Sequence, residues 1–250
     1  MRATDMFWGL LGCGVLIGAW EVAARGCQGF VMPSPAATLI ALCDILSQPD
    51  FWRDDFRISF ERFVCGIALG GGAGNCLGLA AGFYKQLRLA LTPARWMLSS
   101  VPGVVVVMLG MLWFGIDSEM VIFVVALTVV PTVYVGVVEG IRSVDSGLQE
   151  MIAVYRITRL QRFWHVYLPA ITAPLLSSSI IALGGGMRVT ILAETIGATC
   201  GLGHALAIAR TNLDTAALYA LALVSMLLVG VLEAALLLLT RHNTSQRKAR

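Results

Sequence analysis

Residues 149–169 read QEMIAVYRITRLQRFWHVYLP, a polar and basic segment between two long apolar stretches. At helical spacing this segment and the residue before it carry two apolar stripes. The stripes consist of Leu148, Met151, Ile152 and Tyr155, and of Leu160, Phe163, Trp164 and Tyr167. The side chains expected to face away from them are Glu150, Ala153, Arg156, Arg159, Arg162 and His165. A short polar turn would suffice to join two membrane spans, so a pair of amphipathic helices predicts a docking surface for a soluble partner.

The composition indicates a membrane protein. Hydrophobic residues make up 58% of the 250 residues, charged residues only 13%, and the mean hydropathy is +0.80, whereas soluble domains carry about 25% charged residues. A membrane-spanning helix needs about 20 apolar residues. Six runs qualify as candidate spans, at Phe7–Ala23, Phe63–Tyr84, Met97–Phe114, Val121–Glu139, Ile171–Gly197 and Ala216–Leu239. We expect one all-α membrane domain with about six transmembrane helices, and no signal peptide at its start.

The distribution of basic residues predicts the orientation. With a cytoplasmic N-terminus and six spans, the cytoplasmic side carries Arg2, Lys85, Arg88, Arg95, Arg142, Arg156, Arg159, Arg162, Arg241, Arg247, Lys248 and Arg250. The outer side carries Arg25, Arg53, Arg57, Arg62 and Arg210, diluted by acidic residues. The positive-inside rule therefore puts both termini and the 149–169 segment in the cytoplasm. The net charge of +3 is explained by this topology and needs no nucleic-acid partner.

The expected organisation is a single domain over residues 1–250. It consists of a first span and its flank (1–31), an outer interfacial segment (32–62), a core (63–240) that contains a loop at 148–169, and a basic cytoplasmic tail (241–250). Ser34 followed by Pro35 predicts a short helix, capped by Ser34, that continues to about Leu46. A second amphipathic stretch from Phe51 to Phe63 runs into the second span.

The second span has a glycine at every fourth position, namely Gly66, Gly70, Gly74, Gly78 and Gly82. Such a ridge lets another helix approach closely, which favours helix association in lipid. We expect it to pack inside one subunit, and a dimer seam is the alternative.

Prolines lie inside two spans. Pro102 in the third and Pro131 in the fourth should each open the helix locally, and Pro169 and Pro174 bracket the start of the fifth. Backbone groups that lose their helical hydrogen bonds at Pro102 could line a translocation route there. The prolines are equally compatible with ordinary bent helices.

Two ionisable residues, Arg188 and Glu194, lie in the fifth span. A charge at that depth costs about 2.5–3.5 kcal/mol on the insertion scale, so it usually faces protein or a polar cavity. Because they are separated by about 240° around the helix, they do not pair simply with each other. One alternative is a structural pairing with another span. The other is that they lie on a translocation path, with Arg188 presenting positive charge to an anionic solute.

Several kinds of site are not predicted. Neither Lys85 nor Lys248 follows a phosphate-binding Gly-x-x-x-x-Gly pattern, so nucleotide hydrolysis by that route is excluded. No metal-ligand spacing or catalytic cluster is present, and the three histidines are dispersed. Cysteines 13, 65 and 76 are expected to be small buried hydrophobes. A disulfide between Cys27 and Cys43 remains open.

The 149–169 segment, with Glu150 near its start and Leu168-Pro169 at its end, resembles the EAA loop of ABC-importer permeases. Further pieces resemble the nitrate/sulfonate/taurine branch of that family. These are Met32-Pro33-Ser34-Pro35, Trp113-Phe114-Gly115-Ile116, Gly140-Ile141-Arg142-Ser143-Val144-Asp145, Ala193-Glu194-Thr195-Ile196-Gly197 and Gly201-Leu202-Gly203. The likeness covers residues 32 to 240. It departs at Met151 and Ile152, which replace two alanines, and at Arg156, which stands where the family has a glycine.

The resemblance implies the type I ABC-importer permease fold with a cytoplasmic coupling helix, in a multi-pass protein of the bacterial inner membrane. It implies that a cytoplasmic ATPase dimer grips the loop through Glu150, Met151, Ala153, Val154, Arg156, Ile157 and Arg159. The other implied partners are a second copy of the permease, expected to form a homodimer with a heterodimer as the alternative, and an extracytoplasmic solute-binding protein. ATP and Mg²⁺ would bind to the ATPase, so this chain would have no cofactor and no catalytic residue.

Two other functions remain possible from the residues alone. An ATP-independent secondary transporter or channel would work without an ATPase, but no convincing internal repeat is visible. A membrane-embedded enzyme would need a convergent catalytic cluster, which the sequence does not offer. The solute is not determined, although small anions such as nitrate, bicarbonate, sulfonates and taurine are common in the family.

Overall fold

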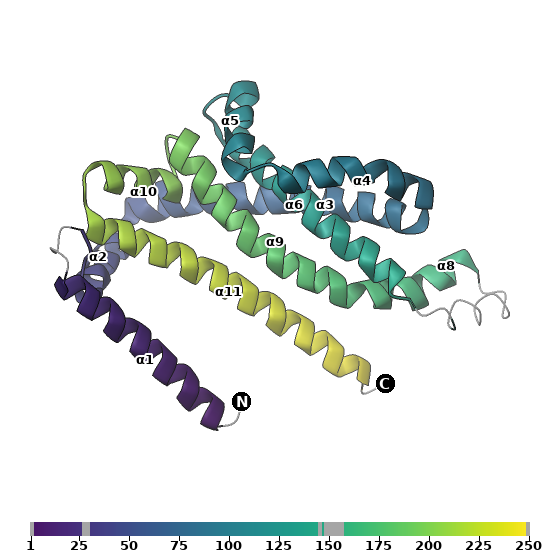
Figure 1. The fold of residues 1–250 in the computed structure, drawn as a ribbon, viewed down its shortest axis with the longest axis horizontal. Coiled ribbons are helices and arrows are strands. Elements are labelled where there is room, and N and C mark those ends of the chain that lie inside the picture. Colours follow the sequence, from purple (N-terminus) through teal and green to yellow (C-terminus); the bar gives the residue numbers. More distant parts are fainter. Residues whose placement is uncertain (1–2, 27–30, 145–146, 148–157, 249–250) are drawn as a thin grey trace.

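A computed structural model of the chain describes residues 3–26, 31–144, 147 and 158–248, and all regular elements in these ranges are helices (Figure 1). The membrane-scale helices and their connecting elements follow in chain order. They are α1 (Ala3–Gly26), α2 (Pro35–Ser47), η1 (Phe51–Phe56), α3 (Arg57–Phe83), α4 (Lys85–Ser100), α5 (Gly103–Phe114), α6 (Ser118–Arg142), α8 (Arg159–Arg162), η2 (Phe163–Tyr167), α9 (Leu168–Gly197), α10 (Leu202–Thr211) and α11 (Thr215–Lys248).

Within these described ranges, five helices are long and apolar enough to cross a membrane, or six if α4 and α5 together form one span. The span expected at Met97–Phe114 is not one straight helix, because α4 and α5 meet at an angle of 99°. The break lies at Pro102, where the sequence predicted that the helix would open. Pro102 explains the break, since a proline disfavours the helical conformation of the residue before it. Val101 is accordingly extended, with φ −72° and ψ 126°, and α5 has only 12 residues.

Pro131 behaves differently from Pro102. Helix α6 continues through it from Ser118 to Arg142, so the expected opening of the helix at Pro131 does not end or split it. Pro131 is buried among neighbouring helices, which is the situation where a proline inside a membrane helix is tolerated. At the start of α9, Pro169 occupies the first turn and Pro174 lies inside the helix.

Helices α3, α6 and α9 form the centre of the molecule and pack side by side. The glycine ridge of α3 lies against α6, as expected for packing inside one subunit. A Cβ at Gly70 would stand 2.5 Å from the carbonyl oxygen of Ala126, and one at Gly66 would stand 2.6 Å from Val125. This close approach of the two backbones requires glycine, and the ridge is covered by α6 rather than left free for a dimer seam.

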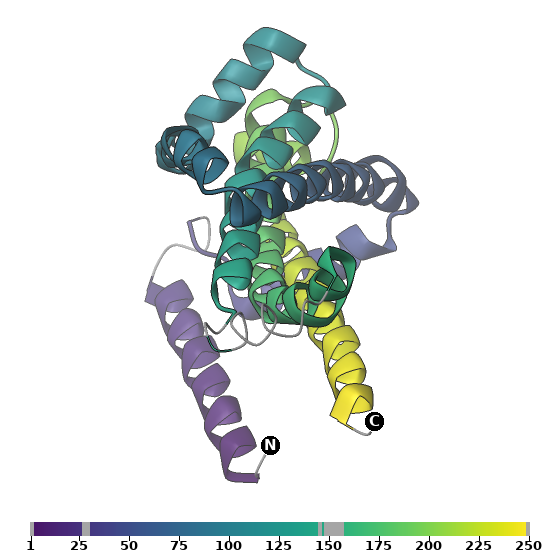
Figure 2. The ribbon, with the colours of Figure 1, turned by 90° about the vertical axis from the view of Figure 1, so that its right-hand side faces the viewer.

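The N-terminal helix α1 lies apart from this centre in both ribbon views, except near its C-terminal end (Figure 2). There Trp20 stacks on Tyr219 of α11, with ring centroids 5.8 Å apart, and its Nε1 donates a hydrogen bond to the carbonyl oxygen of Pro33. The predicted cap of α2 is confirmed, because the Ser34 Oγ accepts a hydrogen bond from the Ala37 amide at 3.2 Å.

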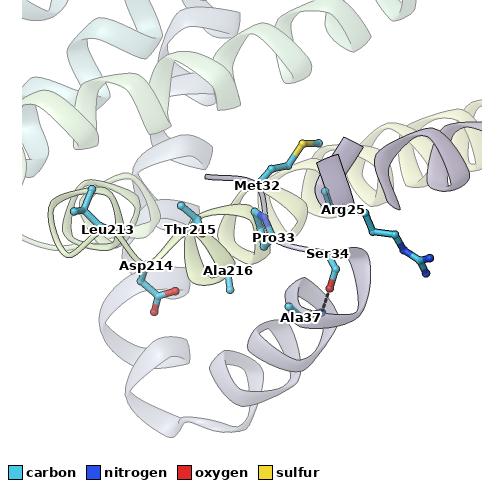
Figure 3. Close-up of a pocket in the computed structure, with 10 residues that line it drawn as sticks. Arg25, Met32, Pro33, Ser34, Ala37, Leu213, Asp214, Thr215 and Ala216 are labelled. Atoms are coloured by element: carbon cyan, nitrogen blue, oxygen red, sulfur yellow. Dashed lines mark hydrogen bonds between the residues drawn. The ribbon is translucent and has the colours of Figure 1, made fainter. Parts of the chain in front are cut away.

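A pocket of about 400 Å³ lies where the end of α1 and the starts of α2 and α11 meet (Figure 3). The side chain of Arg25 points away from it (Figure 3) and pairs with Glu21 at 2.8 Å. Asp214 is occupied in capping α11, since its Oδ1 accepts a hydrogen bond from the Ala217 amide at 3.0 Å. The pocket therefore offers few free polar groups to a solute.

The expectation for the cysteines was wrong. Cys13, Cys65 and Cys76 are exposed on the surface of the single chain, because each lies on a helix face that packs against no other part of it. Cys27 is outside the described residues.

Candidate translocation path and its charged residues

The carboxylate of Glu194, near the C-terminal end of α9, is fully buried and has three hydrogen-bond donors. Its Oε1 accepts from the Arg62 guanidinium at 2.9 Å, and its Oε2 accepts from the Ser59 hydroxyl at 2.6 Å and from the Gly203 amide at 3.0 Å. A buried carboxylate is stable when a counter-charge and hydrogen bonds replace its hydration. This geometry meets that condition.

Arg62, in the second turn of α3, is only 4% exposed and is held from several sides. Besides Glu194, its guanidinium donates to the carbonyl oxygen of Cys200 at 2.8 Å, to the Ser118 hydroxyl at 3.0 Å and to the Cys200 thiol at 3.4 Å. The network thus fastens the start of α3, the start of α6 and the end of α9 to one another.

The Gly201-Leu202-Gly203 turn between α9 and α10 is shaped around this carboxylate. Gly201 has φ +109°, a conformation that favours glycine, and a Cβ there would stand 2.6 Å from a Glu194 oxygen. The Leu202 amide donates to the Ser59 hydroxyl at 2.7 Å. The two glycines and Ser59 therefore bring the turn onto Glu194.

Of the two alternatives for Glu194, the observed contacts favour structural pairing with another span. Its carboxylate faces Arg62 and the α9–α10 turn, and it has no exposed surface from which to meet a solute. We call the cluster of Ser59, Arg62, Glu194 and Cys200 the buried charge network.

Arg188, on the same helix, has a different environment. Its side chain is exposed, and among the described residues it has no hydrogen bond or ion pair. It belongs to a stripe of α9 that the other helices leave largely uncovered, together with Ser177, Ile181 and Gly185. A Cβ added at Gly185 would meet nothing within 4 Å. We call this stripe the open face of α9.

A cavity of about 470 Å³ lies next to the α4–α5 break. Val101 and Gly103, the residues on either side of Pro102, line the cavity, and Pro131 and Val189 contribute to its wall. The hydroxyl-bearing residues along the cavity are Ser99, Thr128 and Thr132, while apolar side chains form most of the remaining wall. The cavity beside the break at Pro102 therefore reaches α9 at Val189, the residue that follows Arg188.

The residues predicted to contact an ATPase fall mostly outside the described ranges, namely Glu150, Met151, Ala153, Val154, Arg156 and Ile157. Arg159 begins α8. In the second predicted stripe, Phe163 and Tyr167 pack against Phe83, with ring centroids 6.4 and 4.9 Å apart. Leu160 and Trp164 are instead 69% and 57% exposed.

Arg162 was expected to face away from this stripe, and that was wrong. Its guanidinium lies 5.1 Å from the centroid of the Tyr167 ring and donates to the Tyr167 hydroxyl. A cation over an aromatic face is a favourable contact, so Arg162 covers Tyr167.

Two charged residues of interest were missed from the sequence. Arg62 was counted as an outer-loop charge, although it lies in α3 and pairs with Glu194. Glu233 lies within the last apolar run, where the argument applied to Arg188 and Glu194 should have identified it. In the described part of the chain, no group of three or more His, Cys, Asp or Glu residues could hold a metal ion.

The chain belongs to the family described as "Binding-protein-dependent transport system inner membrane component", whose model matches residues 74–244. Among its relatives is SsuC of Bacillus subtilis (strain 168), named for aliphatic sulfonates transport, which is 31% identical over 214 residues, 85% of this chain and 77% of that one. The taurine transport system permease protein TauC of Escherichia coli (strain K12) is 29% identical over 231 residues, 90% of this chain and 84% of that one.

A solved structure described as an inward-facing conformation of the MetNI methionine ABC transporter has the same fold. The TM-score is 0.58 at 17% sequence identity, over 74% of this chain and 91% of that one. The chain is therefore a multi-pass permease subunit of an ABC importer, of the sulfonate and taurine type, with the type I permease fold. Permease subunits of this kind are not enzymes, and the family implies an ATPase and a solute-binding protein as partners.

Proposed function

We propose that this permease admits a small anionic solute past Arg188 and is driven by a cytoplasmic ATPase that grips the 148–169 loop. The observation that carries the first part is the exposed guanidinium of Arg188 within a membrane-spanning helix, with no ion pair to the described residues. Such a charge is costly in lipid, so a water-filled path or a second protein surface must receive it. Anionic solutes agree with the names of SsuC and TauC, which refer to sulfonates and taurine.

The open face of α9 supports a path shared with a second copy of the chain. Helix α5, beside it, also exposes large apolar side chains, including Met108, Leu112 and Trp113. A second copy would cover part of this apolar surface, while the face that bears Arg188 would line the space between the copies. An extracytoplasmic binding protein would deliver the solute at the end of the path away from the 148–169 loop, with both termini in the cytoplasm.

The connection from the loop to Arg188 supports the coupling role. Helices α8, η2 and α9 follow one another without a gap from Arg159 to Gly197. Phe163 and Tyr167 attach this run to Phe83 at the end of α3, and Leu160 and Trp164 leave apolar surface exposed within the second half of the loop. Force applied at residues 150–159 would therefore reach α9 directly. No ATP, Mg²⁺ or other cofactor needs to bind to this chain.

The Arg188→Gln variant tests the solute path. A binding screen on the solute-binding protein first identifies the solute, and uptake is then measured in vesicles that contain the assembled complex. We expect uptake of the anion to fall by about tenfold or more, because a hydrogen bond to a charged group contributes about 1.5–3 kcal/mol. The matched control is Arg57→Gln, whose exposed guanidinium pairs with Glu61. Unchanged uptake in an assembled Arg188→Gln complex would contradict the proposal.

The Glu150→Lys variant tests the coupling loop. The expected result is a several-fold loss of solute-stimulated ATP hydrolysis, because the reversed charge would oppose the contact with the ATPase at the loop. Glu61→Lys, at the opposite end of α3 from Phe83, serves as the control. Wild-type turnover in Glu150→Lys would count against this assignment.

A further inference from the structure

Glu233 is a carboxylate inside the last membrane-spanning helix, α11. It is half-buried, and within the ranges that the structure describes it forms no hydrogen bond or ion pair. Its Oε1 lies 3.1 Å from the position that a Cβ would take at Gly184 of α9. The missing side chain of Gly184 therefore leaves the room in which this carboxylate sits.

Arg188 lies one helical turn after Gly184 on the same side of α9. One turn separates the two positions by about 6 Å along the helix, and side chains in a helix lean toward its N-terminus. The Arg188 side chain thus leans toward the level of Gly184, where the Glu233 carboxylate lies.

Both charges border the same uncovered surface. Gly185, between Gly184 and Arg188, has open space beside it. On α11, Gly230 also has open space beside it and Met226 is exposed, and both lie on the side of the helix that bears Glu233. Each isolated charge is costly at this depth, yet neither is neutralised by a hydrogen bond or ion pair of the described chain. This contrasts with the buried charge network, where Arg62 and Glu194 neutralise each other.

We propose that Glu233 is a second charged residue of the translocation path, which together with Arg188 forms a dipolar contact for the solute. Such a contact suits a solute that carries both an anionic group and an ammonium, with the anion at Arg188 and the ammonium at Glu233. This inference rests on the proposed path along the open face of α9. It adds Glu233 to that path and adds the requirement that the solute carries a positive group as well as a negative one.

Thiol labelling of the assembled complex tests the proposal. The variants Glu233→Cys and Arg188→Cys are treated with two methanethiosulfonate reagents of similar size, one bearing a sulfonate and one bearing a trimethylammonium group. Peptide mass spectrometry locates the label, so the native cysteines can remain. Labelling is measured without nucleotide and after trapping with ATP and vanadate.

We expect the new thiol of the Glu233→Cys variant to react faster with the sulfonate reagent. The ratio of the two rates should fall about five- to tenfold when Arg188→Gln is added, as for charges separated by a helical turn. The new thiol of the Arg188→Cys variant should show the opposite preference, and adding Glu233→Gln should remove that preference.

Labelling with no such dependence on the neighbouring charge would overturn the proposal. The proposal would also be overturned if position 188 were labelled in the Arg188→Cys variant while position 233 was not labelled in the Glu233→Cys variant. That result would leave the proposed function intact. If position 188 of the Arg188→Cys variant is labelled neither without nucleotide nor after trapping with ATP and vanadate, the proposed translocation path itself is contradicted.

Protection tests the solute class. An excess of 3-aminopropanesulfonate should slow labelling of the Arg188→Cys variant more than an equal concentration of propanesulfonate does, whereas both compounds should slow labelling of the Glu233→Cys variant. In the Arg188→Cys variant Glu233 remains, and it attracts the ammonium of the zwitterion but repels the monoanion. In the Glu233→Cys variant Arg188 remains, and it attracts the sulfonate that both compounds carry. Equal slowing of the Arg188→Cys variant by the two compounds, or no slowing, would overturn the assignment to a solute that carries both charges.

Discussion

Glu194 and Arg188 lie on the same helix, six residues apart, and their surroundings are opposite. Glu194 is enclosed by Arg62, Ser59 and the Gly203 amide, and has no exposed surface. Arg188 projects from the open face of α9 and meets no counter-charge in the described chain. The first charge is satisfied within one subunit, and the second requires something that the single chain does not provide.

The difference follows from what each side of α9 packs against. One side meets α3, α6 and α10, where glycines permit close contact with the neighbouring elements. The side that bears Arg188 meets little of the described chain. An intramembrane charge therefore reports function only after its possible partners inside the fold have been checked.

The largest effect should come from breaking the buried charge network. Glu194→Gln keeps the shape of the side chain but leaves the Arg62 guanidinium buried without its counter-charge, which costs about 3–5 kcal/mol. We expect a large drop in the apparent melting temperature of the purified chain in detergent, and a lower yield of monodisperse protein. The control is Glu61→Gln, which removes an exposed carboxylate next to Arg62 in the sequence and should change stability by about 0.5 kcal/mol or less.

A melting temperature of Glu194→Gln equal to that of Glu61→Gln would mean that Glu194 does not hold the fold. The contrast between the two charges would then disappear.

A smaller effect is expected at the glycine ridge. Gly70→Ala places a methyl group 2.5 Å from the Ala126 carbonyl oxygen, so that α3 and α6 must move apart. Forcing extra volume into a packed contact costs about 1–3 kcal/mol. Gly71→Ala is the matched control, because a Cβ at Gly71 meets nothing within 4 Å. Thermal unfolding of the two variants compares a covered and an uncovered position directly, and equal stability would argue against the close α3–α6 contact.

The smallest effect should be that of Arg188→Gln on stability. Since Arg188 has no partner in the described chain, its neutral replacement should leave the melting temperature within the range of surface substitutions, about 0.5 kcal/mol. A strong destabilisation of the isolated chain would reveal a structural partner for Arg188, and would remove the basis for placing it on the path.

The features that depend on local pattern could be predicted from the sequence. The capped helix after Ser34, the helical run from Phe51 into the second span, and the close packing at the α3 glycines all follow from the order of residues along one segment. The family resemblance was also visible in motifs, including Ala193-Glu194-Thr195-Ile196-Gly197 and Gly201-Leu202-Gly203.

The features that depend on distant contacts could not be predicted in the same way. Arg62 and Glu194 are 132 positions apart, and only the packing of α3 on α9 brings them together. Pro102 and Pro131 look alike in the sequence, yet Pro131 is buried inside a continuous α6, whereas Pro102 stands at a 99° bend between α4 and α5. Glu233 was overlooked because one acidic residue barely changes the hydropathy of a long apolar run.

The unbroken run from Leu160 to Gly197 has a mechanical consequence. Its 38 residues correspond to a rod about 55 Å long at the usual rise of a helix. A tilt of only about 5° around one end would shift the other end by about 5 Å, close to the rise of one helical turn. Small angular motions at the Leu160 end would therefore produce displacements the size of a small solute at the opposite end.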